Sequence, residues 1–199
     1  MDKVYIMRSG ECRVFFIMLV ATFMSVARAD TWTVEQDGTG DFLDIQPAVD
    51  AASAGDTIRI GPGRFDTFRP FTAPAWTEQV VVGVTKNDLT FIGSGMDVTF
   101  VGPASMADQP SGTPKCFCSI DMYDGTLRDM TISNVQSGIY WWKGHLNVYG
   151  CKFTGEYDSY RGIDIWADGL TVSGCEFVSE HIGGGGISHA RLPFCQCSG

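Results

Sequence analysis

Basic residues are scarce in this chain: 14 lysines and arginines stand against 23 aspartates and glutamates, for a formal net charge of −9. Phosphate backbones repel so acidic a protein, so nucleic acid is not an expected partner. An acidic polysaccharide would need a local basic patch or a bridging cation. Ca²⁺ is the cation that suits this composition, because it binds carboxylate and carbonyl oxygens. No other cofactor is expected.

Long apolar stretches are scarce too. The longest, Val14 to Val26, is too short to span a bilayer comfortably, since a spanning helix needs about 20 apolar residues. It lies between a basic segment and an Ala-Arg-Ala cleavage sequence, which predicts a signal peptide over residues 1–29. Residues 30–199 are enough for one domain with a sizeable core. We expect this domain to be secreted, periplasmic or at the cell surface, without membrane contact after cleavage; an uncleaved anchor is the alternative.

Helical patterns are almost absent, and the clearest one follows the first strand. Thr31 to Val34 favour a strand, and the Asp-Gly-Thr-Gly sequence at 37–40 favours a turn. Asp44 is placed to cap a helix over residues 45–53, whose apolar positions share one face. A strand at 57–60 follows and ends in a Pro-Gly turn. The remaining assignments are strands at 80–84, 89–92 and 98–101, and loops at 66–79 and 103–115.

The second half of the chain repeats with an offset of 24 residues. This offset places Ile139 over Ile163, Leu146 over Leu170, Gly150-Cys151 over Gly174-Cys175 and Phe153 over Phe177. An earlier coil fits loosely, with Ile120 preceding Ile139 and with Leu127, Met130 and Ile132 matching Val148, Cys151 and Phe153. Short alternating strands at such a period are typical of a solenoid, so each repeat is predicted to be one coil of a β-helix.

Alternation along these strands assigns each side chain to the inside or the outside of the coil. The predicted core positions are Ile139, Trp141, Leu146, Val148, Cys151, Phe153, Ile163, Ile165, Leu170, Val172, Cys175 and Phe177. The predicted outer positions are Tyr140, Trp142, Asn147, Tyr149 and Lys152. Lys152 and Glu176 then lie side by side on adjacent coils as a solvent-screened ion pair.

The opening DGTGDF-x-x-IQPAVDAASAGDTIRIGPGRF and the later L-x-V-x-G-C-x-F coils resemble the pectin-lyase-like superfamily of parallel β-helices. The superfamily includes bacterial secreted β-helix proteins and pectinesterases, and the resemblance covers most of residues 31–189. It implies an all-β, right-handed parallel β-helix in which the helix at 45–53 caps the N-terminal end. It implies no single function, because the superfamily holds lyases, hydrolases, esterases, epimerases and non-enzymatic adhesins.

The C-terminal end of the coil stack has no recognisable cap. Without one, the last coil of a β-helix exposes strand edges and core. The tail ARLPFCQCSG at 190–199 matches neither a coil nor a cap. We therefore expect a domain truncated at its C-terminal end. A short β-helix closed by this tail or by a partner is the alternative, and the oligomeric state is open.

The catalytic motifs of the β-helix pectinesterases are absent. Their G-x-Y-x-E corresponds to residues 63–67, which read Gly-Arg-Phe-Asp-Thr, and Q-D-T, D-F-I-F-G and G-R-P-W do not occur. Paired carboxylates support glycoside hydrolysis, and arginine with aspartate supports β-elimination from a uronate with calcium. Arg161, Asp164 and Asp168 are weak candidates for such roles. Asp168 precedes a glycine, as in an ordinary turn, and Asp164 fits a solvated outer position.

Six cysteines follow the leader: Cys116, Cys118, Cys151, Cys175, Cys195 and Cys197. Cys151 and Cys175, on adjacent coils, are either bonded or part of a ladder of buried thiols, and the ladder is favoured. The two C-x-C pairs are spaced too closely for the usual zinc motif, so disulfides between these pairs are favoured over a metal site. His145, His181 and His189 show no ligand spacing.

Trp142 and Trp166 are the candidate binding residues, with Tyr140 beside them. They lie 24 residues apart on the outer face of successive coils, and exposed aromatic rings suit the apolar faces of sugars. Packing under a loop or against another domain is the alternative. The hypothesis is a secreted, non-enzymatic β-helix module that binds carbohydrate or acts at the cell surface. The alternatives are the N-terminal part of a polysaccharide-active enzyme, and a surface spacer without a ligand.

Overall fold

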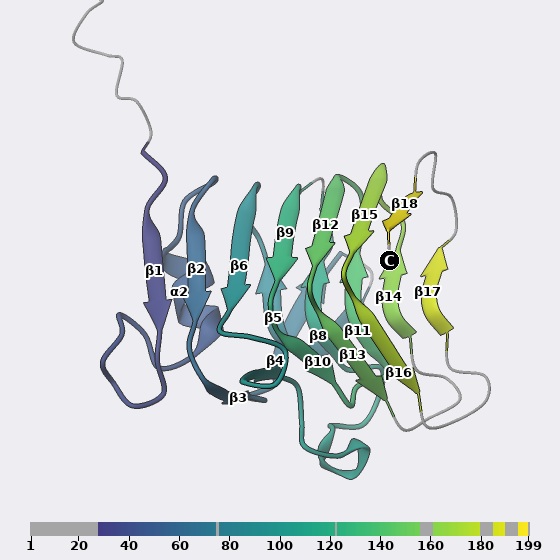
Figure 1. Cartoon of the computed structure of the whole chain (residues 1–199), viewed down its shortest axis with the longest axis horizontal. Helices are drawn as coiled ribbons and strands as arrows, with labels where there is room; N and C mark the ends of the chain where they lie inside the picture. Colours follow the sequence, from purple (N-terminus) through teal and green to yellow (C-terminus); the bar gives the residue numbers. More distant parts are fainter. Residues whose placement is uncertain are drawn as a thin grey trace, which may run out of the picture.

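The computed structural model describes residues 28–74, 76–121, 123–155, 161–179, 185–189 and 195–198. The predicted signal peptide lies almost wholly outside them. The described chain is mostly β and forms three sheets, in which the strands run side by side along the molecule (Figure 1).

The first sheet holds, in spatial order, β1 (Thr31–Val34), β2 (Thr57–Ile60), β6 (Leu89–Gly93), β9 (Gly125–Arg128), β12 (His145–Tyr149), β15 (Gly169–Ser173) and β18 (Cys195–Ser198). The second holds β3 (Gly63–Phe65), β7 (Thr99–Val101), β10 (Thr131–Ser133), β13 (Lys152–Gly155) and β16 (Glu176–Ser179). The third holds β4 (Arg69–Ala73), β5 (Trp76–Val84), β8 (Lys115–Ser119), β11 (Ser137–Trp141), β14 (Arg161–Ile165) and β17 (Gly185–His189). A 3₁₀ turn, η1 (Met106–Asp108), lies in the loop before β8.

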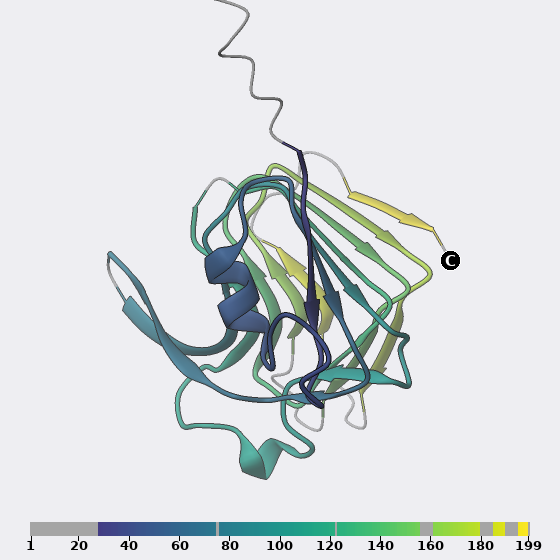
Figure 2. The same cartoon turned by 90° about the vertical axis from the view of Figure 1, so that its left-hand side faces the viewer.

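The chain passes through the three sheets in turn, so that each pass makes one coil. From β9 onward the strands fall in the first, second and third sheet in strict rotation, and each pairs in parallel with its counterpart one coil later. Seen along the stack, the three sheets enclose a common interior (Figure 2). The side chains that fill this interior are apolar, among them Phe91, Phe117, Trp141 and Phe153.

The 24-residue repeat is confirmed by the strand register. Ile139 pairs with Ile163, Leu146 with Leu170 and Phe153 with Phe177. The predicted outer pair of Lys152 and Glu176 is also confirmed, with 3.6 Å between Nζ and Oε2. Because inner positions stack on inner positions, a single pattern of alternation builds a continuous core.

The corner between the first and second sheets uses left-handed backbone in three successive coils. Asp129, Gly150 and Gly174 have φ values of 59°, 54° and 61°. Glycine adopts this conformation without steric cost, and aspartate is among the residues that tolerate it best. The Gly-Cys dipeptide of the repeat therefore marks this corner.

Helix α2 (Ile45–Ala51) lies across the N-terminal end of the stack (Figure 2). Asp44 caps it as predicted by accepting the backbone N–H of Ile45 at 2.8 Å. The predicted apolar face is fully buried at Ile45, Ala48 and Val49. The helix is shorter than predicted, because the chain is already extended at Ala52.

Strand β5, the first parallel strand of the third sheet, has its outer edge closed in two ways. The segment predicted as a loop at 66–79 instead forms an antiparallel hairpin, in which β4 covers β5 from Trp76 to Val80. Further along, the Gln46 side chain of α2 takes the place of a strand. Its Oε1 accepts the Gly83 N–H at 2.7 Å, and its Nε2 donates to the Gly83 carbonyl at 3.1 Å.

The coil before Ile139 has a different length, so that Ile139 pairs with Phe117. Two further expectations were wrong. Phe177 is 38% exposed, since it lies in β16, the last strand of the second sheet among the described residues. The tail contributes a strand after all: β18 continues the first sheet, with Cys195 paired to Leu170.

Replacing Gln46 with leucine should destabilise the protein. The substitution would leave the Gly83 N–H and C=O without their side-chain partner, and an unsatisfied buried group costs about 1–3 kcal/mol. We expect urea unfolding to show a loss of about 2–4 kcal/mol. Gln36→Leu is the matched control, because Gln36 donates to the Arg64 carbonyl at an exposed site. Equal losses in the two variants would contradict the capping role.

Candidate functional site

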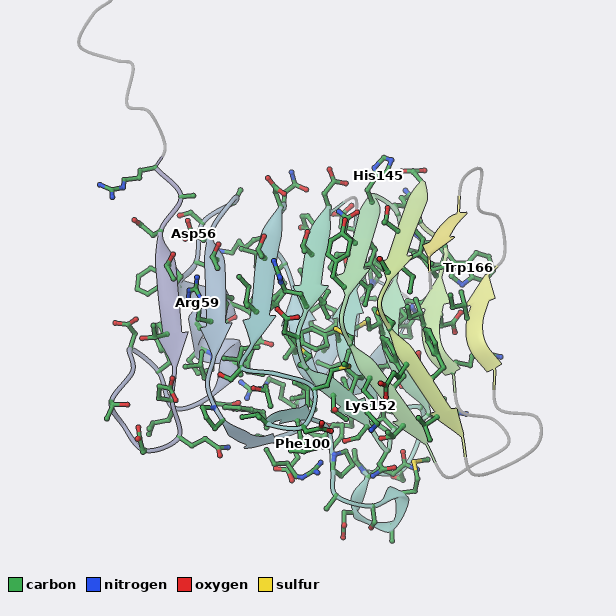
Figure 3. The ribbon with its side chains drawn as sticks, viewed as in Figure 1. Asp56, Arg59, Phe100, His145, Lys152 and Trp166 are labelled. Atoms are coloured by element: carbon green, nitrogen blue, oxygen red, sulfur yellow. The ribbon has the colours of Figure 1, made fainter. Side chains whose placement is uncertain are left out.

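Trp142 and Trp166 directly follow β11 and β14, two neighbouring strands of the third sheet. The backbone pairing continues past the strand ends, since Trp142 donates its N–H to Ser119 at 3.0 Å and Trp166 donates to Trp141 at 2.9 Å. This register brings the two indoles together, with ring centroids 5.5 Å apart and planes inclined by 21°. Trp142 is 36% exposed and Trp166 is 49% exposed. In Figure 3, Trp166 lies near the C-terminal end of the stack, far from Arg59.

The stacking limits what the pair can offer to a ligand. Because each indole covers one face of the other, no sugar ring can enter between them. The surface that remains open belongs mainly to Trp166, the more exposed of the two. The pair therefore offers a ligand the open surface of the Trp166 indole and an edge of the Trp142 indole.

Tyr140 lies two residues before Trp142, on the same outer face of β11. It is half-buried because Trp76 of the β4–β5 hairpin packs edge-on against it, with centroids 6.0 Å apart at 89°. Desolvation by burial, assisted by the negative charges of Asp164 and Glu78, raises the pKa of the Tyr140 phenol to about 12. The phenol is therefore neutral at physiological pH and can donate a hydrogen bond.

Lys115 closes this cluster from the start of β8. Its ammonium lies 5.3 Å from the Tyr140 ring centroid and 5.6 Å from that of Trp76, within the range of cation–π attraction. It donates to the Thr113 carbonyl at 2.8 Å and lies 3.5 Å from a Glu78 carboxylate oxygen. Only 7% of the side chain is exposed. Lys115 thus holds the two rings in place and is not presented to solvent.

Trp76, Glu78 and Lys115 were not predicted, because the first two lie in residues 66–79 and Lys115 ends residues 103–115, and both segments read as loops. The sequence does contain a sign of a longer strand: residues 76–79 continue directly into the β-branched segment at 80–84 that was predicted as a strand. Extending that strand backwards would have brought Trp76 alongside the predicted aromatic residues.

The three weak catalytic candidates fall in different settings. Arg161 and Asp164 form an ion pair on the outer face of β14, with 2.8 Å between Nη1 and Oδ2. Asp164 pairs in register with Tyr140 on the neighbouring strand. Asp168 lies in the turn after β14, where its carboxylate accepts the Gly144 N–H at 3.2 Å. The structure thus places Arg161 and Asp164 beside the aromatic residues and gives Asp168 a turn contact.

The expectation of disulfides between the two C-x-C pairs is wrong for the first pair, Cys116 and Cys118. Cys116 and Cys118 are free and fully buried. They lie on β8 in the third sheet, whereas β18, which carries the second pair, is the last strand of the first sheet. Cys151 and Cys175 are also free, in agreement with the favoured thiol ladder.

Within the described part of the chain, no three His, Cys, Asp or Glu side chains gather closely enough to hold a metal ion. The calcium expectation stays a prediction. His145 is exposed and lies 3.5 Å from an Asp124 oxygen. His181 lies outside the described residues, as does the side chain of His189. None of the helices within the described ranges has the length and apolar character that crossing a bilayer requires.

No family model and no curated protein matches this sequence. Among solved structures, the chain is similar to a pectin methylesterase from carrot, with 14% identity, 84% of this chain and 63% of that chain covered, and a TM-score of 0.49. It is also similar to a pectin methylesterase mutant in complex with a hexasaccharide, with 16% identity, 76% and 55% coverage, and a TM-score of 0.44. The chain thus spans less than two thirds of either structure.

The stacked indoles should produce an exciton couplet in the circular dichroism spectrum, because their transitions lie close together with a fixed inclination. We expect the couplet to vanish equally in Trp142→Ala and in Trp166→Ala, since either change removes one partner. Trp32→Phe is the control, as Trp32 packs against Phe42 and not against another indole. A couplet that survives in either alanine variant would contradict the stacked geometry.

Proposed function

We propose that the chain is a secreted, right-handed parallel β-helix module that binds carbohydrate through the outer face of its third sheet. Residues 1–29 would direct export, and residues 30–199 would form the module. The binding residues would be Trp166, Trp142 and Tyr140. A polysaccharide is the proposed partner, and the role is non-enzymatic.

The observation that carries this proposal is the exposed indole pair on a rigid sheet. Aromatic side chains bind pyranose rings through their apolar faces, and a ring held by its neighbours loses little conformational entropy on binding. Trp142 supports Trp166 from one side by stacking. The neutral Tyr140 phenol lies two residues before Trp142 and offers a hydrogen-bond donor. One sugar unit on Trp166 with a hydroxyl toward Tyr140 suits this arrangement.

The acidic composition bears on which polysaccharides can bind. The net charge of −9 opposes an anionic chain unless a cation bridges the two. The Arg161 guanidinium beside the site is already paired with Asp164. We therefore infer that neutral polysaccharides bind without calcium, and that acidic ones bind only when Ca²⁺ is present.

Affinity electrophoresis through gels that contain neutral or acidic polysaccharides, with Ca²⁺ or with a chelator, tests this proposal. We expect retardation of the native chain in at least one gel. Trp166→Ala should lose most of it, Trp142→Ala less, and the double variant all of it. Tyr149→Ala is the matched control, because Tyr149 is an aromatic residue on the first sheet that is as exposed as Trp142. Its retardation should equal that of the native chain.

Two outcomes would contradict the proposal. One is a folded double variant that is retarded as strongly as the native chain, which would place binding elsewhere. The other is a folded native chain that no gel retards, which would leave a surface spacer as the role. Circular dichroism of each variant establishes that it is folded.

The second candidate is the N-terminal part of a polysaccharide-active enzyme, such as a lyase, hydrolase, esterase or epimerase. It is favoured by Asp164, whose side chain is only 13% exposed and lies between Arg161 and Tyr140 on one face. This candidate predicts that polysaccharides bound in the gels are slowly modified and that Asp164→Asn abolishes the reaction without abolishing retardation. Unmodified polysaccharide after prolonged incubation would exclude it for this chain.

A further inference from the structure

Cys151 and Cys175 occupy the same corner position in two adjacent coils. Each follows a left-handed glycine, and the next residues, Lys152 and Glu176, are paired in register. The Glu176 N–H donates to the Cys151 carbonyl at 2.9 Å, so the two cysteines are direct neighbours across the strands. Opposite residues of neighbouring strands lie about 4.8 Å apart, within the range of Cα separations that a disulfide spans. The two thiols are nevertheless unlinked.

The surroundings of the two sulfurs differ. Cys151 is fully buried, whereas Cys175, one coil further on, is partly exposed. The backbone N–H of Cys151 donates to the Cys175 sulfur at 3.4 Å. When protonated, the Cys175 thiol can itself donate to the carbonyls of Val148 and Ser173, at 3.6 and 3.5 Å. One sulfur of the pair is therefore reachable from solvent, and the other lies behind it.

The two thiols differ in acidity as well as in exposure to solvent. The hydrogen bond from the Cys151 thiol, together with the backbone N–H of Cys151, lowers the pKa of Cys175 to about 7. The same contact with Cys175 and burial raise the pKa of Cys151 well above its usual value. The charged groups near the pair in the described residues include Asp129 in the preceding coil, and Lys152 and Glu176 beside the two cysteines.

The other two described thiols provide an internal reference. Burial raises the pKa of Cys118 to about 12, and it raises that of Cys116 further. Both side chains are inaccessible to solvent. A thiol reacts as its thiolate and only when a reagent can reach it, so Cys116 and Cys118 are inert in the folded chain.

We propose that Cys175 and Cys151 form a thiol–disulfide exchange site for small organic disulfides, with Cys175 as the attacking sulfur and Cys151 as the resolving sulfur. In the first step the Cys175 thiolate attacks one sulfur of the small disulfide. The disulfide bond of the reagent breaks, one small thiolate leaves, and a mixed disulfide forms on Cys175.

In the second step Cys151 gives up its proton to solvent and its sulfur attacks the Cys175 sulfur. The second small thiolate leaves, and a disulfide joins Cys151 to Cys175 across two coils. The pair is oxidised by two electrons and the small disulfide is reduced to two thiols, so the exchange is balanced. This inference is independent of carbohydrate binding.

The test is to treat the reduced, folded chain with oxidised glutathione and to map its thiols by mass spectrometry after trypsin. Cleavage after the flanking lysines and arginines separates the cysteines into different peptides, 116–128, 144–152 and 162–191. We expect a disulfide between peptides 144–152 and 162–191, with Cys116 and Cys118 unmodified. Brief labelling with iodoacetamide should mark Cys175 at least about tenfold faster than Cys116 or Cys118. Its rate should rise with pH up to about 7 and level off above it, as the thiolate fraction does.

Two variants separate the roles. Cys151→Ser should accumulate the mixed disulfide of glutathione with Cys175, since no resolving sulfur is present. Cys175→Ser should leave Cys151 unmodified, because no entry point remains. If native Cys175 is labelled no faster than Cys118, or if Cys151 reacts equally fast in Cys175→Ser, the proposal is overturned. The native measurement needs no variant, so a misfolded variant does not decide the result.

Discussion

In-register stacking of successive coils is the constraint on which the rest of the structure depends. A strand inside one of the sheets pairs its backbone groups with the strands of the preceding and the following coil. The same register fixes which side chains meet, so a position that is apolar in one coil must be apolar in the next. It also brings like residues together, as with the indoles of Trp142 and Trp166 on the outer face and the cysteines at the corner. Both candidate sites are thus products of the repeat.

The parts of the fold that could be predicted are those that repeat at a constant spacing. The strands from β11 to β17 keep the constant offset of 24 residues, and their register follows from the sequence alone. Earlier coils differ in length through their loops, so the 24-residue offset does not extend back to them, and Phe117 lies opposite Ile139. Single-sequence alternation also cannot tell which coil is last, and for that reason Phe177 was assigned to the core.

The candidate site was predictable only in part, because half of it comes from outside the repeat. Tyr140, Trp142 and Trp166 follow from alternation within the coils. Trp76 belongs to an antiparallel hairpin whose prolines, at 70 and 74, resemble those of a loop. An edge strand tolerates proline, so the composition that suggested a loop is equally compatible with β4. That hairpin decides how much of Tyr140 is buried, and with it the ionisation of the phenol.

Helix α2 has a consequence for association between molecules. Gln46 supplies hydrogen bonds to the N–H and C=O groups of Gly83 in β5, and the helix that carries Gln46 has only seven residues. A helix this short has little stability of its own and depends on its packing against the coils. Local opening of α2 would uncover a ready-made strand edge while the rest of the stack stays folded. The rate at which solutions of this protein form edge-to-edge aggregates would then be governed by the fraying of one small helix, long before global unfolding begins.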